Sequence, residues 1–337
     1  MSETERAEAV AAFVGNFPIT ILVPVFNDWN VADLLIDGLD KVFREAGLIG
    51  EVVFVDDGSL EGTLKDIPST RPKNLVRIRV LELRKNMGHQ RALCVGLVYL
   101  QESNMEGAVL VMDADGEDSP SAIPQLLEKY RQEGQRKVVF AERGRRAEGI
   151  LFRVFYQMYR MIHRLLVGFD IRVGNFSILA SSHLNRLVVS SDLWNHYAAA
   201  IIKSRVPSVT VRLDRAKRLS GSSSMNFVGL VTHGLSAMSV FGDIVGTRLL
   251  LVFSGVGVLA MTLIAVTVGV RLATHLAIPG WATYTAGLLL LLLFQSLTLA
   301  LVFTFVVLSS RGQSNFVPMR DCPVYIRKIT TVYERHD

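Results

Sequence analysis

The sequence predicts an α/β domain with a mostly parallel sheet, followed by two helices that cross a membrane. Short β-rich runs alternate with helix-like stretches over the first 140 residues, which is the pattern of an α/β domain. Two long apolar runs without a charged side chain then lie close together near the C-terminus. Each run has the length that a membrane-spanning helix needs.

The predicted strands are apolar without alternation, as expected of strands that helices cover on both faces. They comprise residues 19–26, 51–57, 78–83, 108–113 and 137–141. Helices are expected between them at residues 29–46, 89–103 and 120–133. The last of these helices should open at Ser119 and Pro120, because serine caps helix N-termini and proline suits the first helical position.

Paired acids follow two of the predicted strands directly. "VVFVDD" ends in Asp56 and Asp57, and "VLVMDADGEDSP" carries Asp113 and Asp115 at the end of its apolar run. Ligands bind at the carboxyl ends of strands in open parallel sheets, so these acids should converge on one crevice. Crowded carboxylates are costly unless a cation neutralises them, and Mg²⁺ or Mn²⁺ with bound phosphates is the usual solution. A solvated acidic turn before a helix cap is the alternative, but it leaves Asp113 and Asp115 unexplained.

The two apolar runs, residues 249–270 and 286–308, predict a multi-pass protein of the inner (plasma) membrane. The first run would extend about 33 Å as a helix, enough for a hydrocarbon core of roughly 30 Å. The connector at residues 271–285 has one arginine, whereas five basic residues follow the second run. This bias, together with an N-terminus unlike a signal peptide, places the large first part and both termini in the cytoplasm. Two buried core helices are the alternative interpretation.

Residues 150–169 predict a helix with a basic stripe that includes Arg160 and Arg164 and a mostly apolar remainder. Such a helix suits the membrane interface, although packing on the sheet is the alternative. Residues 225–243 are a second candidate. The net charge of +5 suits an anionic membrane face, and no nucleic-acid partner is expected because no basic run has interleaved aromatics. Cys94 and Cys322 lack pairing or metal spacing and predict free thiols.

Several segments resemble, in order and spacing, the family 2 glycosyltransferases with the Rossmann-like, nucleotide-sugar-binding GT-A fold. They are "ILVPVFND", "VVFVDDGSLEGT", "LRKNMGHQRALCVGL" and "VLVMDADGEDSP". The later segments "FDIRVGNFSILASSHLNRL" and "RLSGSSSMNFVGLVTHGLSAMSVF", with the two apolar runs, are similar to the polyprenyl-phosphate branch, which includes bactoprenol glucosyltransferases and dolichyl-phosphate mannose synthases. The resemblance implies an inverting hexosyltransferase that moves a sugar from a UDP- or GDP-sugar to undecaprenyl or dolichyl phosphate, for cell-envelope glycan or glycoconjugate synthesis.

The resemblance also implies roles for single residues. The nucleotide-sugar donor would be bound by Pro24, Phe26, Asp28, Asp56, Asp57, Asp113 and Asp115, with the metal, Mg²⁺ or Mn²⁺, on Asp115 and Asp113. The acceptor phosphate would be bound by Arg143, Arg145, Arg218, Ser222 and Ser224. Asp115, Asp118 and Arg143 would be catalytic. Solvated or lipid-facing charges are the alternative for the arginines, and a helix cap is the alternative for Asp118; Glu117 is expected to be solvated.

The chain departs from this branch at several positions. His89 and Gln90 stand where Lys and Glu are frequent, Asn175 replaces a common acid, and Met225 stands where Lys is frequent. These differences indicate a different sugar or acceptor. The processive signature Q-x-x-R-W is absent from the sequence, which favours a single transfer.

The predicted organisation has five parts. They are an N-terminal extension (1–17), the GT-A core (18–148), an acceptor-side region with interfacial amphipathic helices (149–243), two transmembrane helices (244–310) and a cytoplasmic C-terminal tail (311–337). The expected partners are the nucleotide sugar, polyprenyl phosphate, the lipid bilayer and further copies of the chain in a homo-oligomer such as a tetramer. Transfer to a lipid-linked saccharide or a protein, and a non-catalytic membrane scaffold, are the alternative functions.

Overall fold

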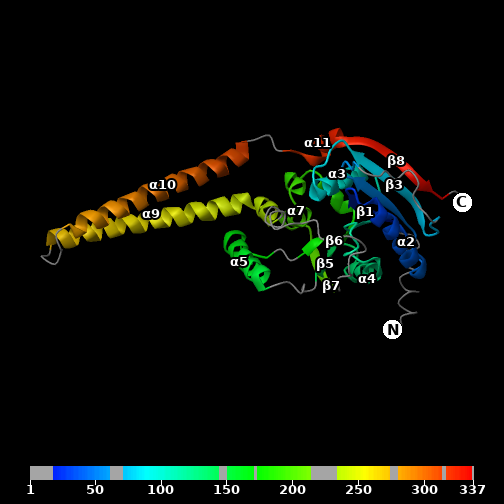
Figure 1. Ribbon diagram of the computed structural model, residues 1–337, viewed down its shortest axis with the longest axis horizontal. Helices are drawn as coiled ribbons and strands as arrows, with labels where there is room; N and C mark the ends of the chain where they lie inside the picture. Colours follow the sequence, from blue (N-terminus) through cyan, green and yellow to red (C-terminus); the bar gives the residue numbers. More distant parts are fainter. Residues whose placement is uncertain are drawn as a thin grey trace. The chain divides into compact units, whose positions relative to one another are not determined.

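The computed structural model describes residues 18–60, 71–143, 150–170, 173–213, 234–273, 280–312 and 316–335 (Figure 1). The chain forms two compact units. The first unit comprises Met1–Ala147, Ile171–Val240 and Asn315–Asp337, and the second comprises Glu148–Asp170 and Phe241–Ser314. The first unit therefore draws on three separate stretches of the chain.

An eight-stranded mixed sheet organises the described part of the first unit, in the order β7-β5-β6-β4-β1-β2-β3-β8. The strands are β1 (Ile19–Val25), β2 (Gly50–Asp56), β3 (Leu75–Leu83), β4 (Ala108–Val111), β5 (Val138–Arg143), β6 (Val173–Ala180), β7 (Ser208–Leu213) and β8 (Ile326–Glu334). Strands β4, β1, β2 and β3 are parallel neighbours, as are β5 and β7. Strand β6 is antiparallel to β4 and β5, and β8 is antiparallel to β3. The predicted mostly parallel α/β sheet is confirmed, with β6, β7 and β8 added.

Helices cover both faces of this sheet. On one face lie α2 (Trp29–Glu45) and α4 (Ile123–Gln132), which follows the 3₁₀ turn η1 (Pro120–Ala122). The other face is covered by α3 (His89–Glu102), α6 (Leu184–Leu187) and α7 (Tyr197–Lys203). Strand β1 serves both layers, because Ile21 and Val23 join the first core and Leu22 joins the second. This two-sided burial is the reason why the strand sequences are apolar without alternation.

Helix α3 lies close to the sheet because of a glycine. A Cβ atom on Gly96 would lie 2.7 Å from Leu22 Cδ1 and 2.8 Å from Val55 Cγ2. Real Cβ atoms do not approach other carbons this closely, so a larger residue would push α3 away from β1 and β2. The close packing fixes where the N-terminal end of α3 lies relative to the carboxyl ends of these strands.

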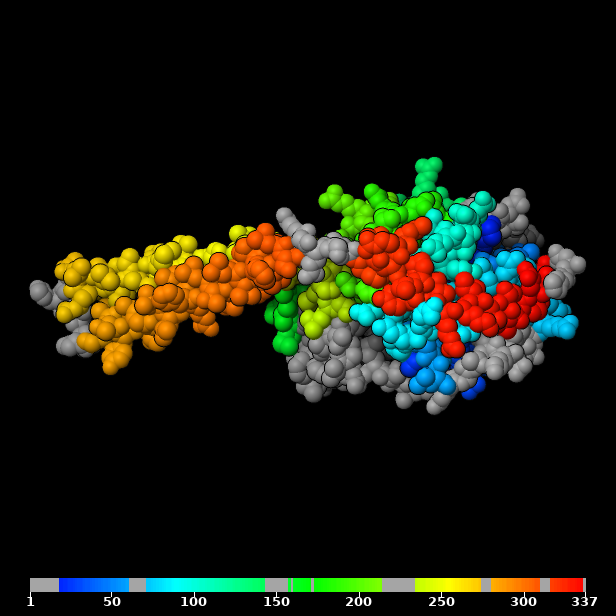
Figure 2. Space-filling model, turned by 90° about the horizontal axis from the view of Figure 1, so that it is seen from above, coloured from blue at the N-terminus to red at the C-terminus, as the bar shows by residue number. Residues whose placement is uncertain are grey.

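The segment after the second long helix returns to the first unit. It forms α11 (Pro318–Asp321), the 3₁₀ turn η4 (Cys322–Tyr325) and then β8. The ring of Trp194 lies 4.2 Å from that of Phe316 and 5.3 Å from that of Tyr325, measured between centroids. Cys322 and Cys94 are buried free thiols whose sulfur atoms are 3.8 Å apart. In Figure 2 this red segment lies against the cyan residues of β3 and α3.

Two long helices dominate the second unit, α9 (Gly242–Ala273) and α10 (Trp281–Gly312), which pack side by side (Figure 1). Both are long and apolar enough to cross a membrane, with mean hydropathies of 2.6 and 2.4. Most of their apolar side chains face outward, as lipid contact would require. Small side chains occupy the contact between the helices, where a Cβ on Gly257 would meet Ser296 Oγ at 3.1 Å, a common arrangement for paired membrane helices.

Helix α5 (Ile150–Val167) packs on α9 within this unit. Arg160 and Arg164 lie on one face of α5, as the sequence predicted, and both form ion pairs with Asp170. Met161 and Leu165 are among its exposed apolar side chains. The interfacial position of α5 stays a prediction. The second candidate helix, residues 225–243, is described only from residue 234, where a short helix covers residues 234–239.

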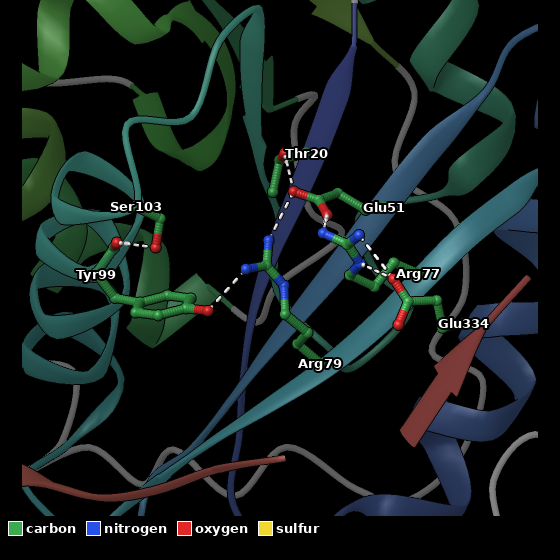
Figure 3. A network of polar contacts seen from close by, with 7 residues as sticks. All are labelled: Thr20, Glu51, Arg77, Arg79, Tyr99, Ser103 and Glu334. Carbon is green, nitrogen blue, oxygen red and sulfur yellow. Dashed lines mark hydrogen bonds and ion pairs between the residues drawn. The ribbon is translucent and has the colours of Figure 1, made fainter. Parts of the chain in front are cut away.

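A network of polar side chains connects β1, β2, β3 and α3 (Figure 3). Glu51 Oε1 accepts hydrogen bonds from Arg79 Nη2 at 2.7 Å and from Thr20 Oγ1 at 2.9 Å. Arg79 Nη1 donates to the Tyr99 hydroxyl at 2.7 Å. The side chains of Glu51 and Arg79 are 17% and 13% exposed, so this ion pair is largely removed from water.

A second, exposed ion pair extends the network to β8. Arg77 Nη2 lies 2.7 Å from Glu334 Oε1, and the two side chains are 44% and 43% exposed. Ion pairs in water contribute little to stability, whereas breaking a buried pair leaves a desolvated charge without its partner. Arg77 Nη1 also lies 3.8 Å from Glu51 Oε2, which joins the two parts of the network. The Glu51–Arg79 and Arg77–Glu334 pairs are expected to differ in strength.

The substitution Glu51→Gln should lower the free energy of unfolding by about 2 kcal/mol, because Arg79 loses its buried counter-charge. The matched substitution Glu334→Gln should lower it by no more than about 0.5 kcal/mol. Urea unfolding of the full chain in detergent, followed by circular dichroism, measures both. Equal effects of the two substitutions would contradict this account.

Candidate active site at the carboxyl ends of the parallel strands

The loops that follow β1 and β2 are tied to each other. The Asn27 backbone N–H donates to Ser59 Oγ at 2.9 Å, and the Leu60 N–H donates to Asn27 Oδ1 at 3.0 Å. Asn27 adopts a positive φ of 57°, which asparagine tolerates better than most residues. Asp56, 5% exposed, accepts the Ser59 N–H through Oδ1 at 2.9 Å. The sequence patterns had not identified Asn27 and Ser59 as parts of this site.

Asp57 connects the end of β2 to the loop before α3. Its carboxylate accepts the N–H groups of Met87 and Gly88, both at 2.8 Å, and its side chain is 2% exposed. Burial raises the pKa of Asp57, while the two N–H groups and His89 oppose that rise. Gly88 has a φ of 90°, a conformation that favours glycine. Asp57 therefore shapes the loop from which α3 starts.

The acidic run after β4 folds into a tight turn. The Asp113 N–H donates to Asp118 Oδ2 at 3.0 Å, and the Glu117 N–H donates to Asp115 Oδ1 at 3.0 Å. Asp113 and Asp115 are half-buried, and Asp118 is 4% exposed. The expectation that Glu117 is solvated is wrong: its side chain is 8% exposed, because the turn folds it inward.

The helix after this turn starts where the sequence predicted. Ser119 is the N-cap residue of η1, and its Oγ accepts the Ser121 N–H at 3.3 Å, with Pro120 in the first position. Ser119 and not Asp118 is thus the helix cap. The carboxylate of Asp118 instead holds the main chain of Asp113, which places Asp118 in the site as a support for the turn.

A chain of amides leads from the acidic turn into the core. Asn175 Nδ2, on β6, donates to Asp113 Oδ1 at 3.0 Å. Gln90 Nε2, on α3, donates to Asn175 Oδ1 at 2.9 Å, and the Tyr197 backbone N–H donates to Gln90 Oε1 at 2.7 Å. Gln90 and Asn175 are two of the positions at which the sequence departs from the resembled branch. Their contact could not be predicted from the sequence, because the two residues are 85 positions apart.

The remaining donor-side residues lie near the end of β1. Pro24 is buried and pairs in register with Val55. Phe26 is 42% exposed. Asp28 is exposed, and its carbonyl oxygen accepts the N–H groups of Val31 and Ala32 in the first turn of α2. Because β2 and β4 flank β1, the ends that carry Asp56 and Asp113 lie roughly 10 Å apart, a span that a nucleotide can bridge.

The predicted acceptor-phosphate residues are mostly outside the described residues. Arg145, Arg218, Ser222 and Ser224 lie there, so their placement is not described. Arg143 ends β5, where its main chain pairs in register with Leu213, but its side chain is also outside the described part. The acceptor side of the site stays a prediction.

The donor set at the acidic turn fits a divalent cation. Asp113 and Asp115 offer carboxylate oxygens at the open end of the sheet, and Mg²⁺ binds through one or two carboxylates together with phosphates and waters. Among the described residues, no group of three or more His, Cys, Asp or Glu side chains could hold a metal ion by itself. Waters and the phosphates of a bound substrate are the usual further ligands of such a cation.

Comparison with known proteins identifies the domain. Residues 20–184 match the model of the family "Glycosyl transferase family 2". A putative glycosyltransferase of Bacillus subtilis, CsbB, is 24% identical over 295 residues, which cover 86% of each chain. The undecaprenyl-phosphate 4-deoxy-4-formamido-L-arabinose transferase of Pectobacterium carotovorum is 24% identical over 67% of this chain and 72% of its own.

Two further comparisons agree. A prophage bactoprenol glucosyl transferase homolog of Escherichia coli is 25% identical over 66% of this chain and 72% of its own. Among solved structures, glucosyl-3-phosphoglycerate synthase of Mycobacterium tuberculosis superimposes with a TM-score of 0.51 at 16% identity, over 71% of this chain and 84% of that one. The latter likeness bears on the fold alone. Residues 20–184 therefore form a glycosyl transferase family 2 domain with the GT-A fold, and the protein is a glycosyltransferase.

Proposed function

We propose that the protein transfers a sugar from a nucleotide sugar, a UDP- or GDP-sugar, to a polyprenyl phosphate at the membrane. One observation carries the proposal. The ends of β2 and β4 present Asp56, Asp113 and Asp115 on the two sides of β1, in a chain that also has two helices apolar enough to cross a membrane. A water-soluble, phosphate-rich donor suits the first feature, and a lipid acceptor suits the second.

The comparisons support both halves of this proposal. Two relatives are described as acting on undecaprenyl phosphate or bactoprenol, and both align with two thirds of this chain. The structure of glucosyl-3-phosphoglycerate synthase is described as a complex with Mn²⁺ and UDP-glucose. A polyprenyl phosphate acceptor, a nucleotide-sugar donor and a divalent cation are thus consistent choices for this chain.

On the donor side, we assign the nucleotide to Asp56 and its neighbours Pro24, Phe26, Asp28 and Asp57. Asp113 would face the ribose and sugar, and Asp115 would hold Mg²⁺ or Mn²⁺ with Asp113. The cation, when bound, would neutralise the diphosphate that departs. Asp118 would keep the turn in place through the Asp113 N–H.

On the acceptor side, a phosphate monoester is already mostly ionised near neutral pH, since its second pKa is about 6. Its oxygen needs little help from a general base to displace the nucleotide with inversion at the anomeric carbon. Guanidinium groups bind phosphate oxygens in pairs, which is the role assigned to Arg143, Arg145 and Arg218, with Ser222 and Ser224. The catalytic part and both termini would lie in the cytoplasm, and a homo-oligomer is expected.

An assay with a panel of nucleotide sugars, with polyprenyl phosphate, a lipid-linked saccharide or a protein as the acceptor, and with and without Mg²⁺ or Mn²⁺, tests this function. A lipid-linked sugar product supports it. Product formed only on a lipid-linked saccharide or a protein would show that polyprenyl phosphate is not the acceptor. No product from any donor would favour a non-catalytic scaffold.

The substitution Asp115→Asn should lower the rate of product formation about 100-fold or more, because charge stabilisation of the leaving group is lost. Glu106→Gln is the matched control: it removes one carboxylate at an exposed position and should leave the rate unchanged. A wild-type rate for Asp115→Asn would contradict the assignment of the cation to Asp115.

Cysteine labelling tests the membrane topology. The native Cys94 and Cys322 are fully buried, so they should add little background. Ala273→Cys, exposed at the end of α9, should react with a membrane-impermeant maleimide in intact cells, as expected of the short outer connector. Lys41→Cys, exposed on α2, should react only after permeabilisation. The opposite labelling pattern would show that the membrane topology is the inverse of the one proposed.

A further inference from the structure

We propose that Asn175 and Gln90 act as one coupled pair of amides that orients Asp113 toward the donor, so that Asn175 is a positioning residue of the active site. This inference rests on the proposed function, because it assumes that Asp113 faces the nucleotide sugar. It goes further by assigning a role to two residues that the family resemblance marks only as departures.

The direction of each hydrogen bond follows from one main-chain group. The Tyr197 backbone N–H can only donate, so the atom of Gln90 that faces it at 2.7 Å must be the oxygen. The amide nitrogen of Gln90 then points to Asn175 Oδ1 at 2.9 Å. The amide nitrogen of Asn175 consequently points to Asp113 Oδ1 at 3.0 Å. Neither amide can turn over without placing like groups against each other.

Burial holds the two side-chain amides in this orientation. Gln90 is 7% and Asn175 is 4% exposed, so water cannot easily replace a lost partner, and an unsatisfied buried amide is costly. Tyr197 N–H lies in the first turn of α7, where main-chain donors have no acceptor within the helix. The side chain of Gln90 supplies that acceptor, and α7 in turn fixes Gln90.

A second contact fixes the main chain of Asn175. Ser177 Oγ donates to the Asn175 carbonyl oxygen at 2.9 Å and lies 2.8 Å from the Tyr197 hydroxyl. The single hydroxyl proton of Ser177 is donated to the Asn175 carbonyl oxygen. The Tyr197 hydroxyl must therefore be the donor in its hydrogen bond with Ser177 Oγ. Burial raises the pKa of Tyr197, so this hydroxyl keeps its proton. Asn175 is therefore held at both its backbone and its side chain.

The pair explains why two departures occur together. An amide at position 175 needs a donor for its oxygen, which the amide of Gln90 provides and a carboxylate at position 90 would not. With Glu at position 90, Asn175 would turn its nitrogen toward that carboxylate and its oxygen toward Asp113. An acid at position 175 would place a second carboxylate at 3.0 Å from Asp113 Oδ1 in the present geometry. The two amides thus supply Asp113 with an uncharged donor.

The test measures binding of UDP and of GDP, each with Mn²⁺, to the full chain in detergent by titration calorimetry. Asn175→Leu keeps the size of the side chain and removes its donor, so it should raise the Kd of the nucleotide that binds about 10-fold. Gln90→Glu should raise the Kd similarly, through Asn175. In the double variant, Gln90→Glu should add nothing to the effect of Asn175→Leu, because coupled residues are not additive.

Asn74→Leu is the matched control. Asn74 donates its side-chain amide to the Leu48 carbonyl at 2.9 Å before β3, at the opposite end of the sheet from the acids. It should lower the Tm without changing the Kd, which separates a loss of stability from a loss of nucleotide binding. A wild-type Kd for Asn175→Leu, or independent additive effects of Asn175→Leu and Gln90→Glu, would overturn the coupling.

This binding assay needs no lipid acceptor, so it separates the two proposals. Weakened nucleotide binding in Asn175→Leu without any lipid-linked product in the wild type would support the amide pair and reject the proposed acceptor. Normal product formation with unchanged nucleotide binding in Asn175→Leu would reject the amide pair and support the proposed function. A wild-type chain that binds neither UDP nor GDP would overturn both.

Discussion

The carboxylates of this site are held in place by main-chain N–H groups. Asp56 accepts from Ser59, Asp57 accepts from Met87 and Gly88, and Asp115 and Asp118 accept from the turn after β4. Parallel strands bring these acids together, and their mutual repulsion would open the loops without such donors. Each donor bond supplies a partial positive charge at a fixed place, which lets several acids lie at one end of the sheet. The geometry of the site depends on this arrangement.

Much of the fold could be predicted from local patterns. The strands at residues 19–26, 51–57 and 108–113 are apolar because both faces are covered, and acids mark where the second and third of them end. Strands β7 and β8 carry no such pattern, since they are edge strands with mixed exposure. The pairing of β8 with β3 joins residues 257 positions apart, and no local pattern reports a contact of that range.

The acidic residues of the site could be predicted from the sequence, but the contacts between them and their neighbours could not. Asp56, Asp113 and Asp115 follow strands, and this is visible in the sequence. Asn27 and Ser59 join the site through turn geometry, and Asn175 reaches Asp113 from an antiparallel strand that no pattern had indicated. The burial of Glu117 depends on how the acidic turn folds, so its charge suggested solvent exposure that the tertiary structure does not give.

The late position of β8 in the chain has a consequence for biogenesis. A ribosome must synthesise α9 and α10 before it reaches the strand that covers β3. During this time β3 is a sheet edge with open main-chain groups, which is a site where nascent chains can associate wrongly. The sheet can close only after both long helices have left the ribosome. Synthesis of the two long helices therefore precedes completion of the sheet, so a chain released early would carry an unfinished edge.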